Sequence, residues 1–303
     1  MPQIKANGIS LEYESFGPED RETVLLIMGF SGQLTMWPVE LCDEIVKRGY
    51  RAIRFDNRDV GLSSKIEGAG VPDMEKVVGS LLGGAAYVPA YSLDDMAADA
   101  AGLLDALGIE RAHIVGASMG GMIAQLVAAN HPEKTLSLTS IMSNTGNPDL
   151  PQGKPEAMGA LLAPAPAPDD IEAIVQRGID TWKTIGSPGY KTDDATIREW
   201  VIRDTKRSYY PAGTARQLAA IVGNGDRREK LKRVKAPTVV LHGAEDPLVP
   251  VEGGKDTAAS IAGAELRIIP GMAHDFPISL VPVFADAIEA AAKRASGVSR
   301  AAD

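Results

Sequence analysis

Residues 112–122 read AHIVGASMGGM, and this stretch decides the fold. Residues 112–115 predict a strand, and a helix is predicted to begin at Met119. Between them stands Gly116-Ala117-Ser118-Met119-Gly120, the G-x-S-x-G pattern in the strand-to-helix context that this motif requires. Glycines remove the steric clash of so tight a turn, which leaves the serine hydroxyl exposed at a helix N-terminus. The stretch predicts an α/β fold and a candidate nucleophile, Ser118; an incidental serine in a glycine-rich turn is the alternative.

Strand and helix patterns alternate on both sides of this stretch, which indicates a mainly parallel sheet with helices on both faces. Asn7-Gly8 predicts a hairpin between two short strands within residues 2–16. Further strands are predicted at 24–28, 51–55, 135–142, 237–242 and 264–269, and helices at 37–48, 93–107, 119–129 and 281–295. Ser92 and Gly108 are the expected N-cap and C-cap of the 93–107 helix.

The alternation breaks after residue 143. Residues 144–170 are rich in Pro and Gly, with APAPAP at 163–168, and indicate a hinge or loop. Helical patterns follow near 169–185, 193–209 and 211–222. We therefore predict a helical lid over residues 144–232, inserted into a core made of residues 1–143 and 233–303.

Composition bounds the class of protein. Of 303 residues, 45% are hydrophobic and 23% charged, which is typical of a globular protein with a sizeable core. The formal net charge of −9 argues against nucleic acid as a partner. Cys42 is the only cysteine, and the sequence shows neither a signal-peptide pattern nor an apolar run long enough to cross a bilayer. We expect a soluble, cytoplasmic protein that acts on a small molecule, with a homo-oligomer left open.

A serine nucleophile needs a base, and the sequence offers four histidines. His113 lies in the strand before the G-x-S-x-G turn and is expected to point into the packing. His131 is expected to be solvated at a helix end, and His242 to shape the loop after its strand. His274 lies in Gly-Met-Ala-His-Asp, in the loop between the last strand and the last helix. In sites built on a G-x-S-x-G serine, the histidine follows the serine and the acid along the chain. His274 has that position, so it is the candidate base.

The acid is expected after the strand that follows the lid. His-Gly-Ala-Glu-Asp-Pro at 242–247 offers Glu245 and Asp246. Asp246 is preferred because Asp-Pro marks a turn off a strand end, and Glu245 is the fallback. Asp275 is adjacent to His274 and is poorly placed to fold back onto that ring. A turn-capping role is the alternative for Asp246, and the order Ser118, Asp246, His274 strengthens the reading of all three.

Together these segments resemble the α/β-hydrolase family over nearly the whole chain, with support from residues 25–30 and 55–63. Within the family the sequence is similar to lidded, aclacinomycin methylesterase-like carboxylesterases, which also begin the oxyanion loop with Met-Gly. Most members have His-Gly there, whereas this chain has Met28. The resemblance implies that the backbone N–H groups of Phe30 and Met119 are the oxyanion donors.

Other residues receive weaker predictions. Asp56-Asn57-Arg58-Asp59 is expected to lock a loop below the site by Arg–carboxylate pairing. Trp37, Met142 and Trp182 are the candidate substrate contacts, with ordinary core packing as the alternative. The expected mechanism uses no cofactor and no metal.

The predicted activity is hydrolysis of a small-to-medium apolar carboxylic ester by a serine hydrolase. A cofactor-free haloperoxidase or perhydrolase uses a similar set of residues and is the alternative. A ligand-binding receptor on the same fold is a second, less favoured alternative. Carbon–carbon hydrolase and hydroxynitrile lyase activities are disfavoured because no dedicated lid residue stands out. A dehalogenase or epoxide hydrolase would need Asp at the Ser118 position.

Overall fold

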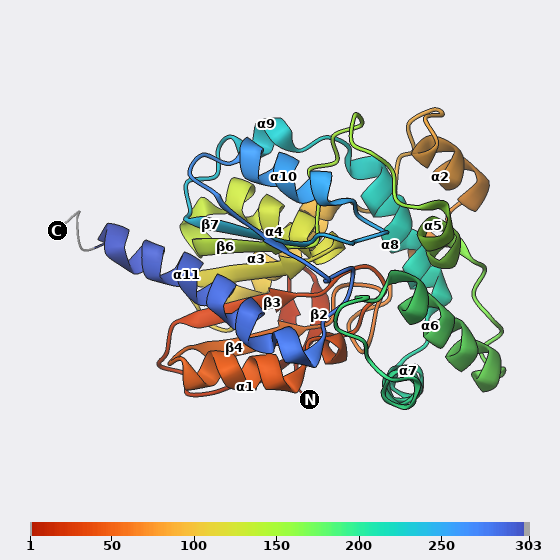
Figure 1. Ribbon diagram of the computed structural model, residues 1–303, viewed down its shortest axis with the longest axis horizontal. Coiled ribbons are helices and arrows are strands. Elements are labelled where there is room, and N and C mark those ends of the chain that lie inside the picture. Colours follow the sequence, from red (N-terminus) through yellow and green to blue (C-terminus); the bar gives the residue numbers. More distant parts are fainter. Residues whose placement is uncertain (1, 300–303) are drawn as a thin grey trace.

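The computed structural model describes residues 2–299 and contains an eight-stranded sheet between layers of helices (Figure 1). The strands are β1 Gln3–Ala6, β2 Ile9–Phe16, β3 Thr23–Ile27, β4 Arg51–Phe55, β5 Ala112–Ala117, β6 Thr135–Ile141, β7 Thr238–Gly243 and β8 Glu265–Ile269. Their order in the sheet is β1-β2-β4-β3-β5-β6-β7-β8. The β1–β2 and β2–β4 pairs are antiparallel, and all pairs from β4 to β8 are parallel. The predicted mainly parallel sheet is confirmed.

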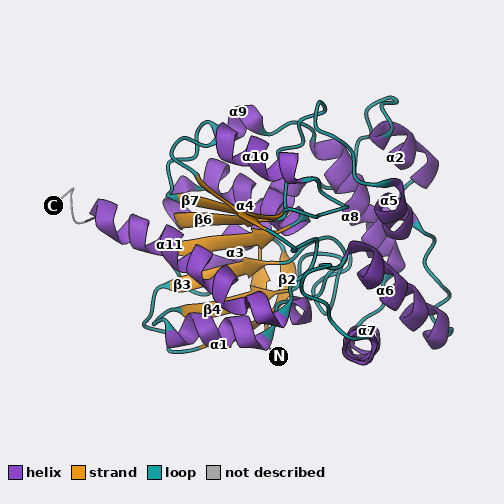
Figure 2. Ribbon diagram, in the orientation of Figure 1, coloured by secondary structure: helices purple, strands orange, loops and turns teal. Residues whose placement is uncertain are grey.

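Helices cover both faces of this sheet (Figure 2). On one face α1 Val39–Lys47 packs beside α11 Val281–Ser299, and on the other α3 Leu93–Ala106 packs beside α4 Met119–Asn130. All five residues of β3 are buried, as expected for a strand with both faces covered. Ser92 caps α3: its hydroxyl accepts from the Asp95 amide and the Asp95 carboxylate accepts from the Ser92 amide. The N-cap predicted from sequence is therefore confirmed.

Further helices lie between β6 and β7. They are α5 Pro155–Leu162, α6 Ile171–Ile185, α7 Asp194–Arg207, α8 Pro211–Asn224 and the short α9 Arg228–Leu231. In Figure 1 the first four, called the inserted helices below, lie beyond one end of the sheet. The expectation of loop throughout residues 144–170 is wrong, because α5 forms inside this segment. Pro155 occupies the first turn of α5, where its missing N–H costs nothing, and the residues after it favour helix.

Some helices had no counterpart in the predicted pattern. They are α2 Met74–Leu81, which packs beside α8, and α10 Val251–Ser260, which packs on β7 and β8. Short 3-10 turns occur at Leu34–Met36, Glu67–Ala69, Pro132–Lys134 and Ile278–Leu280. Within residues 2–299, no helix combines the length and apolar character that crossing a membrane demands.

Candidate active site

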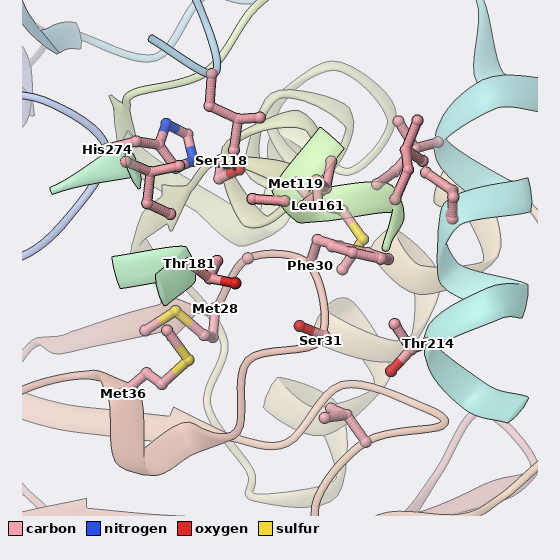
Figure 3. Close-up of a pocket in the computed structure, with 18 of the residues that line it drawn as sticks. Met28, Phe30, Ser31, Met36, Ser118, Met119, Leu161, Thr181, Thr214 and His274 are labelled. Carbon is pink, nitrogen blue, oxygen red and sulfur yellow. Dashed lines mark hydrogen bonds between the residues drawn. The ribbon is translucent and has the colours of Figure 1, made fainter. Parts of the chain in front are cut away.

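Ser118 occupies a strained turn between β5 and α4. Its backbone has φ 55° and ψ −122°, a conformation that L-residues other than glycine rarely adopt. A Cβ atom at Gly116 would lie 2.0 Å from the Gly120 carbonyl oxygen, and one at Gly120 would lie 2.0 Å from the Ile27 carbonyl oxygen. Both flanking positions therefore require glycine. The turn holds the Ser118 side chain at the start of α4, where it borders a large cavity (Figure 3).

His274 and Asp246 lie next to this serine although they are far from it in the sequence. His274 Nε2 is 3.0 Å from Ser118 Oγ, and His274 Nδ1 is 2.7 Å from Asp246 Oδ2. The other oxygen of Asp246 accepts hydrogen bonds from the amides of Leu248 and Val249, which fixes the carboxylate. The three side chains form a continuous hydrogen-bonded chain at the carboxyl ends of β5, β7 and β8.

The neighbouring acids that the sequence offered are engaged elsewhere. Glu245 accepts a hydrogen bond from the Gly271 amide at 2.6 Å. Asp275 accepts hydrogen bonds from both the hydroxyl and the amide of Ser187. Burial raises the pKa of Asp275 above its usual value. Neither carboxylate contacts the His274 ring.

The remaining histidines have structural surroundings. His113 is buried, as expected, and its Nδ1 lies 2.9 Å from the Ser137 hydroxyl. His242 is fully buried, and its Nε2 donates to the Val249 carbonyl at 2.8 Å, which ties down the loop that carries Asp246. Burial lowers the pKa of His242, which favours the neutral form of that ring. His131 is partly exposed at the end of α4, in line with the solvated position predicted for it.

The loop after β3 approaches Ser118 closely. A Cβ atom at Gly29 would lie 3.0 Å from Ser118 Cβ, which is tighter than an ordinary van der Waals contact, so glycine suits this approach. Met28 is buried, and its carbonyl accepts a hydrogen bond from the Asn57 side chain at 2.8 Å. Figure 3 shows Met28, Phe30 and Met119 around the same space as Ser118. The Asn57 contact holds the segment that carries the predicted donor at Phe30.

Side chains of the segment between β6 and β7 hold the loop after β3 and the loop that carries His274, and no sequence pattern predicted these contacts. Gln217 of α8 accepts from the Ser31 amide at 2.9 Å and donates to the Arg58 carbonyl at 2.8 Å. Ser187, which follows α6, bonds to Asp275 and accepts from the Ala273 amide next to His274. No local pattern links residues so far apart in the chain, so only the folded structure identifies them.

The charged segment at 56–59 plays the structural role that was predicted. Arg58 forms a two-point pair with Asp99 of α3 at 2.6 and 2.7 Å. Asp59 forms a similar pair with Arg216 of α8 at 2.8 and 2.7 Å. These buried pairs connect the loop below the site to a core helix and to an inserted helix.

Comparison with known proteins agrees with this architecture. A family model described as the alpha/beta hydrolase fold matches residues 22–171. The chain has the α/β-hydrolase fold. It is 26% identical to rhodomycin D methylesterase DauP of a Streptomyces species, over 94% of this chain and 95% of that protein. It is also 26% identical to 3-oxoadipate enol-lactonase 2 of Acinetobacter baylyi, over 96% of each protein.

The solved structures agree on the fold. A meta-cleavage product hydrolase from Pseudomonas fluorescens matches with a TM-score of 0.73 at 20% identity, over 97% of this chain and 98% of that one. The curated relatives above are hydrolases of the esterase type, and the predicted resemblance to methylesterases is confirmed. The fold class predicted from the sequence is confirmed as well.

A cavity of about 1730 Å³ lies between the sheet of this α/β hydrolase and its inserted helices. Ser118 and His274 open onto it, and its walls are rich in methionine side chains (Figure 3). Two of the three predicted substrate contacts, Met142 and Trp182, line it. Trp182 packs against Trp200 with ring centroids 5.6 Å apart, which forms an aromatic part of the wall.

The third predicted contact is wrong. Trp37 is fully buried and belongs to the apolar layer between the sheet and helices α1 and α11. Its ring packs against Phe276 at 4.8 Å between centroids, and it does not line the cavity. The chain turns inward after the Leu34–Met36 turn, so Trp37 packs in the core, the alternative that its sequence position left open.

Proposed function

We propose that this α/β hydrolase cleaves small-to-medium apolar carboxylic esters through an acyl-enzyme formed on Ser118. The observation that best supports the proposal is the hydrogen-bonded chain from Ser118 through His274 to Asp246. A hydroxyl 3.0 Å from an imidazole whose other nitrogen contacts a fixed carboxylate is the arrangement of an activated serine nucleophile.

In the first step Ser118 Oγ attacks the ester carbonyl carbon while its proton passes to His274 Nε2. The tetrahedral intermediate collapses, the bond to the leaving alkoxide breaks, and His274 returns the proton to give the free alcohol. Water then attacks the acyl-enzyme with His274 as base, which releases the acid and restores Ser118. Asp246 keeps Nδ1 of His274 protonated and stabilises the imidazolium that forms in each step.

The backbone N–H groups of Phe30 and Met119 are the donors we assign to the oxyanion. Met119 begins α4, so its amide lies at the positive end of the helix dipole. Phe30 follows Gly29, where an added Cβ atom would lie 3.0 Å from Ser118 Cβ. One such donor typically contributes about 10²–10³ in rate. Both are backbone groups, so their contribution depends on how firmly the two loops are held.

We further propose that residues 144–232 act as a lid. Its helices α5–α8 supply much of the wall of the cavity, including Trp182 and Trp200. A largely apolar wall around the serine suits the hydrocarbon part of an acyl group and limits the access of bulk water to the reacting carbonyl.

The test is replacement of the nucleophile. Ser118→Ala should lower kcat for p-nitrophenyl esters by at least about 10⁴-fold while the thermal unfolding curve is retained. A fluorophosphonate probe should label the native chain at Ser118, as located by peptide mass spectrometry. The matched control is Ser260→Ala, because Ser260 lies on α10 and bonds only its own helix through the Asp256 carbonyl. Wild-type turnover by Ser118→Ala, or labelling at another serine, would show that the nucleophile is misassigned.

A second assay separates hydrolysis from the alternatives. The same enzyme is given a panel of esters and, separately, peroxide with bromide. We expect ester hydrolysis to exceed bromination at every ester chain length that fits the cavity. Faster halide-dependent bromination would assign the site to perhydrolysis, and a single slow turnover with retained product would assign it to ligand binding.

A further inference from the structure

Four arginines line the cavity, and three of them are occupied by the protein itself. Arg54 pairs with Glu14, and Arg203 pairs with Asp204. Arg227 is fully buried and donates to oxygens of Gln125, Asn144, Asn224 and Gly225. These arginines therefore serve the fold of the cavity wall.

Arg177 of α6 differs from these three. A guanidinium carries five N–H donors, and here one nitrogen donates to the Ala163 carbonyl at 2.6 Å. Its Nε is buried and has no hydrogen-bond partner. Within residues 2–299, no carboxylate lies within ion-pair distance of this group. Arg177 thus places an uncompensated positive charge and several unused donors at the wall of the proposed substrate cavity.

The position of Arg177 relative to the serine follows from the geometry of α6. One face of this helix, with Ile174, Arg177, Thr181 and Ile185, lines the cavity, and Thr181 is seen there in Figure 3. The Ile185 carbonyl accepts a hydrogen bond from the His274 amide at 2.9 Å. Eight residues separate Arg177 from Ile185, a rise of roughly 12 Å along the helix axis. Arg177 therefore lies well along α6 from the end of the helix that contacts the His274 loop.

We propose that Arg177 binds a carboxylate of the ester substrate at the end of the cavity away from Ser118. The preferred substrate class is then an ester or lactone that carries a second, ionised carboxyl group several carbons from the scissile carbonyl. This proposal rests on the function proposed above, and it narrows the apolar ester to one whose hydrocarbon chain ends in a carboxylate. A planar guanidinium matches a carboxylate with two parallel hydrogen bonds, which favours that anion over a neutral amide of the same size.

The surroundings of Arg177 suit such a group. Apolar side chains line the wall near α6, among them Leu161, Trp182 and Trp200. In such a setting a paired charge is favoured over an unpaired one, because an unpaired ion bears its desolvation cost alone. The hydrocarbon segment between the two carboxyl groups would lie against the methionines and aromatic rings of the wall.

The experiment compares matched pairs of esters. Monomethyl esters of the dicarboxylic acids from succinate to sebacate are each assayed beside the same methyl ester with a terminal carboxamide. The wild type should favour the carboxylate member of the longer pairs in kcat/KM by about 10- to 100-fold, through KM. Arg177→Gln should abolish this preference, and Arg177→Lys should restore part of it. Arg198→Gln is the control, because Arg198 is an exposed lid arginine on α7 that pairs with Glu172 outside the cavity.

Failure of this proposal can be told apart from failure of the proposed function. No carboxylate preference at any chain length, or an equal preference in Arg177→Gln, overturns the role of Arg177 while ester hydrolysis stands. Binding is measured separately by calorimetry, with the free dicarboxylates and the Ser118→Ala enzyme. Dicarboxylates should bind to that variant and lose affinity about 10-fold or more when Arg177→Gln is added. Equal affinity in the two forms refutes the site irrespective of turnover.

Discussion

Asp246→Asn offers the sharpest test of the hydrogen-bonded chain, because the structure dictates how the new amide must lie. Oδ1 of Asp246 accepts from the Leu248 and Val249 amides at 2.9 and 2.8 Å. An asparagine must keep its carbonyl oxygen there, since its NH₂ group would face two donors. Its NH₂ group then faces Nδ1 of His274. Nδ1 becomes an acceptor, the proton moves to Nε2, and Nε2 can no longer take the Ser118 proton.

The expected loss follows from this change of tautomer. An aspartate-to-asparagine change that leaves the geometry of such a site intact lowers kcat by about 10⁴-fold. At 1.36 kcal/mol per factor of ten, this is roughly 5.5 kcal/mol of transition-state stabilisation. The fold should survive, because both backbone hydrogen bonds to the side-chain oxygen are retained.

The assay is kcat for a p-nitrophenyl ester near neutral pH, beside thermal unfolding. Glu245→Gln is the matched control: it changes the adjacent acid, which bonds the Gly271 amide and does not touch His274. That variant should stay within about tenfold of the wild type, because its hydrogen bond supports a loop without entering the reaction. Activity of Asp246→Asn within tenfold of the wild type, with an intact unfolding curve, would refute the assignment of Asp246. A larger loss in Glu245→Gln than in Asp246→Asn would make Glu245 the acid.

Three further variants test the surroundings of the serine. Gly120→Ala would place a Cβ 2.0 Å from the Ile27 carbonyl oxygen, and we expect roughly 3 kcal/mol of lost stability and a lower Tm by calorimetry. Gln217→Met removes the hydrogen bond to the Ser31 amide, and kcat should fall about tenfold with little change in KM in steady-state assays. An effect confined to KM would place Gln217 against the substrate instead. Trp37→Phe should cost about 1–2 kcal/mol of unfolding free energy in urea while the ester chain-length profile is unchanged. A shifted profile would restore Trp37 as a substrate contact.

Local sequence patterns were sufficient to predict the strands and helices whose surroundings are the same along their length. Residues 24–27 of strand β3 are apolar because both faces of the sheet are covered, and Ser92 before the helical pattern indicates the start of α3. They were insufficient for α10, which contains Gly253 and Gly254. A Cβ at Gly254 would lie 2.6 Å from the His242 ring of β7, and one at Gly253 would lie 2.8 Å from Asn144, so both glycines allow the helix to pack closely. Their tertiary role lowers local helix propensity, which hides α10 from a sequence pattern.

The residues of the candidate active site also fall into two groups, those that a sequence pattern indicates and those that only the folded structure identifies. Ser118 and its glycines are dictated by backbone geometry within a few residues, and His274 and Asp246 by their order after the later strands. Gln217 and Ser187 hold the loops around the serine from more than sixty residues away in sequence, and nothing local marks them. Trp37 is the opposite case, because its place in the sequence suggested a substrate contact that the structure does not show. It directly follows the loop near Ser118, yet it packs between the sheet and helices α1 and α11.

The sequence by itself therefore determined a mainly parallel sheet with Ser118, Asp246 and His274 each following a strand. Because parallel strands have their carboxyl ends on the same side of the sheet, these residues were expected to lie there together. Only the tertiary structure decided which side chains face the cavity and which of them already have ion-pair or hydrogen-bond partners within the protein. Both depend on the packing of the inserted helices against the sheet. Arg177 is the clearest case: its sequence context resembles that of any surface helix, and its unused charge becomes visible only once the helix is folded over Ser118.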